Sequence, residues 1–418
     1  MKRILAILTL FTIWAEAQTL TLKQCVDQAL ATHPDIQSFM LRLQQSEENI
    51  KSSRSAFLPQ VMLHGNYDFQ RTYALPVNGQ FHTKDDTGWS AGVGLRQKIW
   101  DFEKSSRLSD ASKLGKAIAK ARLRDARALM IMRVRTAYLQ LLVNRTAIDV
   151  YTKDLEAKQA LYDQAKAMRH QGLKTKADEL RFFAALEEAK DALSGAQSAY
   201  AQSKIALETL IGKPIPETVT FDATSLADVA KHITIPDEAM LVKTNPKLAV
   251  ARLEAKADKK RYLAAKAQRF GSLDLVADLS HVDTLSAYDT KQAGVQYNAP
   301  IFSGGKLSAE AQKAKIAVQI AVENIEAQKR TLLQNYYSLK ADITHLRQSL
   351  RTQQARIAAA KESEKLLLAR YKAGVSTYIQ LLDTQSVLLK ARLALLQSRY
   401  RLAETLNRLQ YLTGKNDV

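Results

Sequence analysis

The sequence contains an internal repeat, and this duplication limits the possible folds more than any other feature of the sequence. At an offset of 212 residues, His33-Pro34 falls on Asn245-Pro246. At an offset of 202, Gly172 falls on Gly374, and further pairs keep the same order through both halves. The difference between the offsets places ten extra residues in a loop of the first half. Each half is therefore predicted to be one copy of the same supersecondary pattern.

Each half contains two segments in which apolar and polar residues alternate, the pattern of a strand with one apolar face. The segments span about 60–70 and 88–100 in the first half, and about 272–282 and 291–301 in the second. Their polar faces carry Gly, Asn, Gln and charged residues. Apolar-faced segments of about ten residues are typical of transmembrane β-barrels. A soluble antiparallel hairpin packed on a helix would show the same alternation.

Long helices follow each pair of strands. Residues 103–169 and 306–372 contain no proline, and at about 1.5 Å per residue each stretch would be on the order of 100 Å long. In the second stretch, seam positions step by four and three residues from Leu339 to Tyr371, which is the period of a left-handed coiled coil. Glycine turns at Gly172 and Gly374 then predict antiparallel helical hairpins. With only 15 Gly and 8 Pro in 418 residues, little room remains for a loop-rich or all-β domain.

The first residues have the pattern of a secretory signal peptide. Lys2 and Arg3 precede an apolar run, and Ala15-Glu16-Ala17 forms a small-x-small cleavage site. We therefore expect a signal peptide at 1–17 and an exported protein. The first repeat then spans 18–213, a linker spans 214–246, and the second repeat spans 247–418.

Composition excludes several other classes of protein. The mean hydropathy of −0.24 and the lack of a further long apolar stretch exclude a polytopic helical membrane protein. The net charge of +19 is spread among acidic residues at helical spacing, without a nucleic-acid-binding motif. We interpret it mainly as solvated helix faces, and an acidic partner or anionic lipid remains open as a further reason for the charge. Export keeps the chain away from nucleic acid. The single cysteine, Cys25, allows no intrachain disulfide.

The sequence shows no catalytic motif. Its seven histidines are far apart and lack the spacing of a metal site, and Gly304-Gly305 lacks the surroundings of a phosphate-binding loop. We therefore expect no catalytic residues, no cofactor and no metal. Four strands per chain also cannot close a barrel, and lipid tolerates no open sheet edge. Two chains would supply eight strands and three would supply twelve, and only the larger barrel leaves room for water.

At this point the chain resembles the TolC-type outer-membrane efflux proteins over nearly all of its length after residue 18. The motifs that carry the resemblance stand in the family's order in both halves. They are Leu22-x7-Leu30-x3-Pro34, Ala56-Phe57-Leu58-Pro59-Gln60, Pro300-Ile301-Phe302-Ser303-Gly304-Gly305, Tyr371-Lys372-Ala373-Gly374-Val375-Ser376-Thr377 and Leu412-Thr413-Gly414.

The resemblance implies a homotrimer in the outer membrane of a Gram-negative bacterium. Its fold would be mainly α with a membrane β-barrel, in which a barrel of twelve strands continues into a periplasmic tunnel of twelve helices. The resemblance also implies contact with outer-membrane lipid, a periplasmic adaptor (a membrane fusion protein) and an inner-membrane transporter that supplies the energy. The function would be that of a passive exit duct for efflux or type I secretion.

The family's gate lies at the periplasmic helix ends, where a ring of Asp narrows the pore and an Arg and a Tyr hold neighbouring coils together. Asp178, six residues after Gly172, matches the ring position, and Tyr371 matches the gate Tyr. Ser376 stands where the Arg would be, so that salt bridge is not expected here. The two turns resemble the adaptor-docking turns of the family, which assigns docking to Gly172, Leu173, Gly374, Val375, Ser376 and Thr377.

The first repeat departs from the family at the end of its second strand. Lys98 replaces a Pro there and Asp101-Phe102 replaces Ser-Gly, while in the second repeat Gly271 replaces the Pro that Pro59 supplies in the first. Two other functions remain open from the sequence alone. One is a periplasmic coiled-coil scaffold of the envelope without a pore. The other is a duct dedicated to protein secretion, because the channel sequence does not identify the cargo.

Overall fold

The computed structural model describes residues 19–74, 82–222, 235–283, 287–373 and 375–414, so the expected signal peptide at 1–17 lies outside the described residues. The chain divides into two compact units. The helical unit comprises Met1–Gln37, Asp125–Asn245 and Thr331–Val418, and the strand-bearing unit comprises Ser38–Arg124 and Pro246–Arg330. Each unit therefore contains segments of both sequence repeats.

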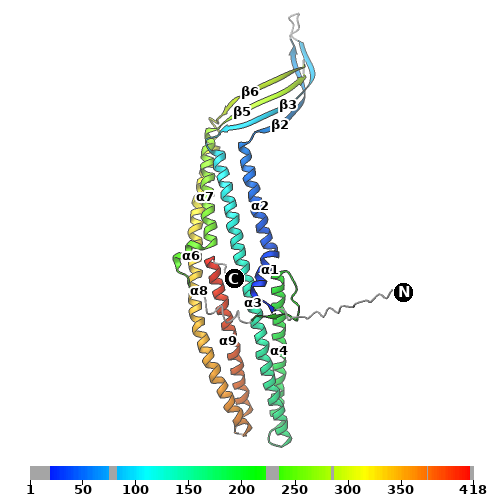
Figure 1. The fold of residues 1–418 in the computed structure, drawn as a ribbon, viewed down its shortest axis with the longest axis vertical. Coiled ribbons are helices and arrows are strands. Elements are labelled where there is room, and N and C mark those ends of the chain that lie inside the picture. Colours follow the sequence, from blue (N-terminus) through cyan, green and yellow to red (C-terminus); the bar gives the residue numbers. More distant parts are fainter. Residues whose placement is uncertain (1–18, 75–81, 223–234, 284–286, 374, 415–418) are drawn as a thin grey trace, which may run out of the picture. The chain divides into compact units, whose positions relative to one another are not determined.

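The four long helices show the duplication directly (Figure 1). Helices α3 (Lys104–His170) and α8 (Lys306–Lys372) each have 67 residues, and α4 (Lys176–Ile211) and α9 (Tyr378–Thr413) each have 36. Each 67-residue helix is about 100 Å long at the rise of an α-helix. No described helix has both the length and the apolar character that crossing a bilayer requires.

The coiled-coil seam predicted for 339–371 is confirmed. Every seam position is buried or half-buried, whereas most positions between them are exposed. The seam residues are Leu339, Ile343, Leu346, Leu350, Gln353, Ile357, Ala360, Glu364, Leu367 and Tyr371. The same steps continue backwards to the buried residues Tyr336 and Leu332. This spacing keeps one stripe of α8 against its neighbours over its whole length in the helical unit.

Shorter elements complete the helical unit. Helix α1 (Leu22–Thr32) buries Cys25, as expected for a small apolar residue. Strand β1 (Thr19–Leu20) pairs in parallel with β4 (Thr220–Phe221), and α6 (Glu238–Thr244) precedes the second repeat. The buried Tyr138 of α3 joins these segments, because its hydroxyl donates to the Leu20 carbonyl and accepts from the Asp222 amide.

Two helices of similar length, each followed by a short 3-10 helix, precede strands of the sheet. Helix α2 (Pro34–Arg54) is followed by the short 3-10 helix η1 (Ser55–Phe57), and α7 (Pro246–Ala267) by η2 (Gln268–Phe270). Both begin with the proline that favours a first helical turn. After η2, Gly271 has φ +77° and ψ −152°, a conformation that is essentially restricted to glycine.

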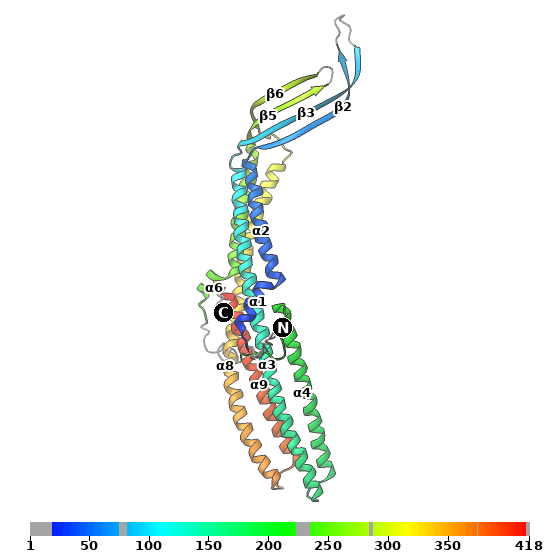
Figure 2. The ribbon, with the colours of Figure 1, turned by 45° about the vertical axis from the view of Figure 1, so that its right-hand side comes forward.

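The sheet contains β2 (Gln60–Ala74), β3 (His82–Trp100), β5 (Ser272–Asp283) and β6 (Ala287–Asn298). Its order is β2-β3-β5-β6, every neighbouring pair is antiparallel, and β2 and β6 form its two edges (Figure 2). The strands expected at 60–70 and 88–100 are longer than expected and continue toward the hairpin loop. The strand expected at 291–301 is shifted, because β6 begins at Ala287 and ends at Asn298.

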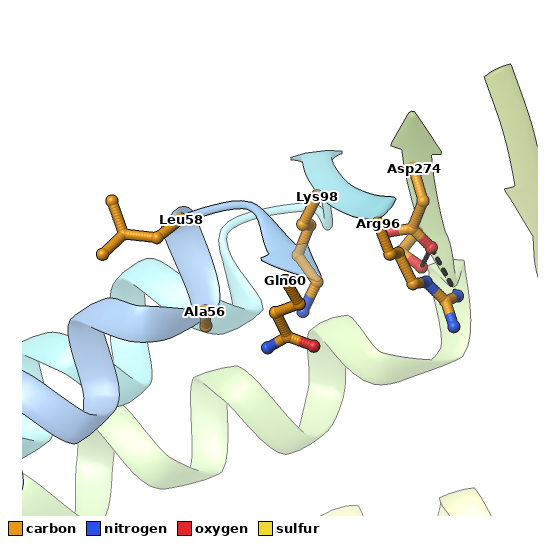
Figure 3. A pocket seen from close by; sticks show the side chains of 7 residues that line it. Ala56, Leu58, Gln60, Arg96, Lys98 and Asp274 are labelled. Atoms are coloured by element: carbon orange, nitrogen blue, oxygen red, sulfur yellow. Dashed lines mark hydrogen bonds and ion pairs between the residues drawn. The ribbon is translucent and has the colours of Figure 1, made fainter. Parts of the chain in front are cut away.

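The two faces of the sheet differ in polarity. On one face Leu63, Val93 and Leu279 are in-register neighbours, and the same face carries Val295, which pairs with Leu275. All of these apolar side chains are exposed. The opposite face is polar. There Arg96 of β3 and Asp274 of β5 point toward one another with 2.8 Å between Nη2 and Oδ2, beside a cavity of about 270 Å³ (Figure 3).

The alternation predicted for 88–100 breaks before the strand ends. Lys98 lies opposite Asp274, but Trp100 lies opposite Leu273, so a β-bulge at this point leaves one extra residue on β3. Simple alternation places Trp100 on the polar face. The bulge instead turns it to the face of Leu273 and Tyr297, which is the apolar one.

Candidate functional site

The first helical turn joins α3 to α4 through a glycine in the left-handed region. Gly172 has φ +74°, its amide donates to the Arg169 carbonyl, and the Leu173 amide donates to the Met168 carbonyl. This pair of bonds is a Schellman motif, which satisfies the last carbonyls of α3. The Leu173 side chain is exposed beyond it. The helix-end hydrogen bonds therefore fix the backbone of Gly172 and Leu173, the residues expected to dock an adaptor here, and both residues remain exposed.

The second turn has the same construction where the structure describes it. The Val375 amide donates to the Arg370 carbonyl, which repeats the bond made by Leu173, and the Val375 side chain is exposed. Gly374 lies outside the described residues. Ser376 is buried, and its hydroxyl donates to the Leu367 carbonyl over 3.3 Å. The small side chain at this position of the turn therefore bonds the preceding helix, α8.

Both returning helices start with a capping box. Thr175 caps α4, and its backbone amide donates in turn to Asp178 Oδ2 over 3.0 Å. Thr377 caps α9 in the same way, with Gln380 as the reciprocal partner. Asp178 and Gln380 are equivalent at the repeat offset of 202. The acceptor oxygen of Asp178 thus closes the helix start, which satisfies backbone amides that the first turn leaves unpaired.

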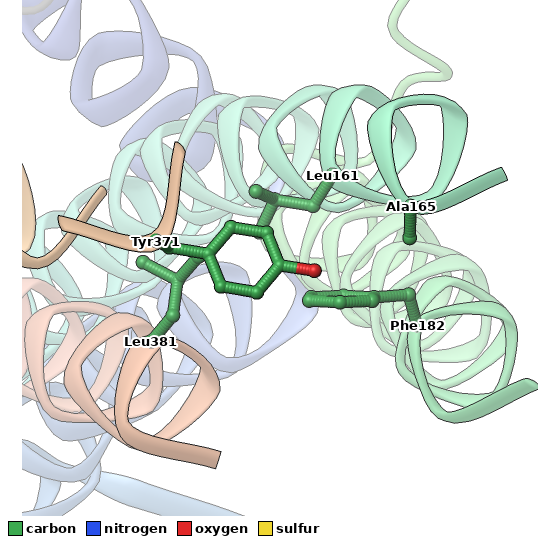
Figure 4. Close-up of a cluster of buried hydrophobic side chains, with 5 residues drawn as sticks. All are labelled: Leu161, Ala165, Phe182, Tyr371 and Leu381. Atoms are coloured by element: carbon green, nitrogen blue, oxygen red, sulfur yellow. The ribbon is translucent and has the colours of Figure 1, made fainter. Parts of the chain in front are cut away.

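Tyr371 lies at the centre of a buried cluster between the two hairpins (Figure 4). Its ring meets that of Phe182 edge to face, with 5.7 Å between centroids, and the ammonium of Lys174 lies 4.9 Å from its ring centroid. The cluster is completed by Leu161, Ala165 and Leu381. The Tyr371 hydroxyl is buried and has no hydrogen-bond partner among the described residues. Burial, and after it the charge of Asp178, raises the pKa of Tyr371 above its usual value.

Sequence reasoning missed an ion pair at the first turn. Arg169 of α3 pairs with the buried Glu179 of α4, and Lys176 reaches the other carboxylate oxygen over 3.2 Å. Burial opposes ionisation of Glu179, but the hydrogen bond from Lys176 and the charge of Arg169 hold its pKa below the usual value. At the offset of 202, Arg169 is equivalent to Tyr371. Comparison of the two turns would therefore have marked Arg169 as a candidate contact residue.

One lysine of the helical unit is buried, although most of the excess charge is interpreted as solvated helix faces. Lys158 of α3 is buried, and its ammonium donates to Gln385 of α9 over 2.9 Å. Burial lowers the pKa of Lys158, against the opposing effects of Asp154, Glu188 and Glu364. Burial also raises the pKa of Asp154. All four long helices therefore contribute polar or charged groups to this level of the helical unit.

The departures from the family at the end of β3 lie close together. Lys98 pairs with the buried Asp101 over 3.4 Å, and Asp101 Oδ2 accepts from both the amide and the hydroxyl of Ser105. Phe102 and Glu103 adopt positive φ of 54° and 67°. Gly304 and Gly305, which are their equivalents, have φ of 58° and 79°. The first repeat thus keeps the backbone conformation of the Gly-Gly turn with two residues that are not glycine. The left-handed conformation is energetically costly for residues that carry a Cβ.

Within the described part of the chain, no group of three or more His, Cys, Asp or Glu residues could hold a metal ion. Apart from Gly374, which lies outside the described residues, the residues expected to form the gate and to dock an adaptor lie in the helical unit around two turns. Their contacts are those of helix capping, apolar packing and one ion pair.

Comparison with known proteins gives one consistent result. The sequence model for the outer membrane efflux protein family matches residues 25–213 and 239–415. Outer membrane protein TolC of Vibrio cholerae is 24% identical over 93% of this chain and 88% of its own length. The TolC protein of Escherichia coli is also 24% identical, over 96% of this chain and 84% of its own length. A crystal structure of CusC superposes with a TM-score of 0.82 at 19% identity, covering 94% of this chain and 92% of that one.

Proposed function

Because the chain belongs to the outer membrane efflux protein family, we propose that it works as the passive outer-membrane exit duct of a tripartite efflux system. The observation that carries the proposal is the four-stranded sheet. One of its faces is apolar and exposed, the other is polar, and both of its edges, β2 and β6, lack a partner strand within the described chain. Lipid tolerates no such edge, so further copies must close the sheet into a barrel.

Three copies are the number that a duct requires. Eight strands from two copies would leave an interior that side chains fill, whereas twelve from three leave a water-filled lumen. The polar face of the sheet would line that lumen. On this face Arg96 pairs with Asp274, and the His64 ring lies 3.6 Å from a carboxylate oxygen of Asp278, so basic and acidic side chains lie side by side. We therefore expect a lumen that does not strongly select the charge of its cargo at this level.

The long helices would continue the lumen into the periplasm and close it at their turns. In this proposal the gate is held by the Tyr371 cluster and by the pair of Arg169 with Glu179, and Asp178 contributes negative charge beside the pore. Ser376 replaces the family's Arg, so apolar packing around Tyr371 takes a larger share of closure. The exposed side chains of Leu173 and Val375, beside Gly172, Gly374 and Thr377, would meet a periplasmic adaptor.

The duct has no chemistry of its own in this proposal. Energy would come from an inner-membrane transporter, and the adaptor would open the gate. The chain is therefore not an enzyme, in keeping with a family named for efflux. A duct for polypeptides by type I secretion would use the same parts, because the pump and adaptor select the cargo.

The first test is the mass of the complex extracted from outer membranes in detergent, followed by its conductance in planar bilayers. A trimer with a small closed conductance is expected. A monomer recovered without detergent would leave both sheet edges unpaired and contradict the proposal. That result would favour the envelope scaffold that lacks a pore.

A further inference from the structure

Two basic side chains beside the sheet have no acidic partner. Lys266 and Arg269, at the end of α7 and in η2, are exposed, and no described carboxylate pairs with either. Other basic residues of the same unit do have such partners, for example Lys260 with Asp110 and Arg261 with Asp258. An unpaired cation pair in this position is therefore available to an external anion.

The position of these cations relative to the membrane follows from the strands. The β-bulge brings Trp100 to the apolar face, in the same row as Tyr297 of β6. The Tyr297 hydroxyl donates to the Phe270 carbonyl over 2.9 Å, and the Phe102 ring lies 5.2 Å from that of Phe270. We call Trp100, Phe102, Phe270 and Tyr297 the aromatic collar. Aromatic rings at the end of apolar strand faces are typical of the membrane–water boundary.

Arg269 is fixed against this collar, since its guanidinium carbon lies 4.6 Å from the centroid of the Phe270 ring. Such stacking leaves the edge of the guanidinium free to donate hydrogen bonds. Beside Arg269 and Lys266 is a pocket of about 340 Å³ whose other wall is formed by Pro300, Ile301 and Phe302. Ile301 and Phe302 are almost completely exposed, at 101% and 89%. The pocket therefore combines two cations with an uncovered apolar wall.

We propose that this pocket binds an anionic phospholipid at the periplasmic boundary of the membrane. The phosphate would lie between Lys266 and Arg269, and an acyl chain would cover Ile301 and Phe302. The charges are complementary, because each basic residue at an anionic membrane surface strengthens attraction about fivefold. The apolar wall needs a hydrocarbon partner, which a free phosphate would not supply. The proposal depends on the duct only for the position of the membrane.

The test measures lipid retention by the delipidated, detergent-purified complex, using native mass spectrometry with added phosphatidylglycerol or phosphatidylcholine. The wild-type protein is expected to retain phosphatidylglycerol in preference. The double variant Lys266→Gln/Arg269→Gln should bind it at least about tenfold more weakly. The matched control is Arg356→Gln/Lys361→Gln, which removes the same charge from exposed positions of α8 and should change nothing.

A third variant, Phe302→Ser, tests the apolar wall and should weaken retention of both lipids. Equal retention of the two lipids by the wild-type protein would overturn the proposal. So would unchanged phosphatidylglycerol binding by the double variant. If the double variant instead dissociates the oligomer while the remaining complexes keep their lipid, the pocket is covered by a second copy of the chain. Export is not measured in these experiments, so failure of the lipid site and failure of the duct are distinguishable.

Discussion

The ring of Tyr371 lies edge to face against the ring of Phe182, 5.7 Å away between centroids, and so joins the second helical hairpin to the first. The two residues come from α8 and α4, and the contact is buried. Among the described residues, the hydroxyl of Tyr371 gains no hydrogen bond there. In its described contacts Tyr371 therefore packs as an aromatic side chain and does not act as a hydrogen-bond donor.

This contact predicts different results for two substitutions of Tyr371. Tyr371→Phe keeps the ring and removes an unsatisfied hydroxyl, so stability should be unchanged or about 1 kcal/mol higher. Tyr371→Ala should cost about 3–5 kcal/mol locally and raise the closed-state conductance in planar bilayers. Loss of closure in Tyr371→Phe would show that the hydroxyl has a partner in the assembled gate.

Asp178 has a capping role and a proposed pore role, and two substitutions separate them. Asp178→Asn keeps an oxygen that can accept from the Thr175 amide but removes the charge. We expect it to reduce cation preference and block by divalent cations without lowering thermal stability. Asp178→Ala should lower both, since it also breaks the capping box. Unchanged ion selectivity in both variants would leave Asp178 as a capping residue alone.

The Glu179 ion pair predicts how the first turn responds to acid. Because the pKa of Glu179 is lowered in the folded protein, its contribution is complete above the usual carboxyl range and is lost as pH falls through the lowered value. Thermal stability of the wild-type protein should therefore exceed that of Glu179→Gln at pH 7 and pH 5. The two should converge only below about pH 4. A difference that already disappears by pH 6 would contradict the assigned pair.

The buried pair of Lys158 and Gln385 predicts a non-additive response. Lys158→Met alone leaves the Gln385 amide without its partner and should cost about 1–3 kcal/mol. Adding Gln385→Leu should recover this loss, because an apolar pair of similar volume fits a buried site. The measurement is a double-mutant cycle of thermal unfolding. Additive effects would mean that the two side chains do not interact.

Lys158 also gives this pair a pH dependence. Its pKa is lowered by burial, so the charged form is disfavoured in the folded state. Stability should rise as pH increases through the lowered pKa toward the usual lysine value of about 10.4. The variant Lys158→Met/Gln385→Leu should lack this rise in stability.

Substitution of Gly271 by alanine is expected to prevent assembly, and the same substitution at a second glycine serves as the control. A Cβ at Gly271 would lie 1.9 Å from the Asn298 carbonyl oxygen, and the backbone has a positive φ. Gly271→Ala should therefore greatly reduce the yield of assembled protein in the outer membrane. Gly115 lies inside α3, and a Cβ there would meet no atom within 4 Å, so Gly115→Ala should be neutral or stabilising by about 0.5–1 kcal/mol. Equal yields from both variants would contradict the close approach.

Much of the fold was predictable because two periods are plain in the sequence. The 3.5-residue period fixed the seam of α8, and alternation located all four strands. Alternation did not predict the β-bulge at Lys98–Trp100, since one inserted residue depends on pairing with β5. The end of β6 was missed for a similar reason, because the apolar pattern continues to Ile301 after pairing has ended at Asn298.

The candidate site was less predictable than the fold. The turns were predictable from glycine and from threonine caps, which act locally. The pairing of Arg169 with Glu179 and the burial of Lys158 were not, because each depends on a side chain from another helix. A charged residue looks the same in the sequence whether water or a neighbouring helix surrounds it. The gate and docking roles of these residues stay predictions.

The two helical turns share their described helix-end hydrogen bonds and threonine caps, but different side chains hold them together. Where the first turn has a charged couple, the second has an aromatic ring and a leucine at the equivalent positions. Acid should loosen the former as Glu179 takes up a proton and scarcely affect the latter, whereas cooling weakens apolar association and spares the charged couple. The duplicated turns are therefore held by interactions of different kinds, one sensitive to acid and the other to temperature, and a substitution can change either one without the other.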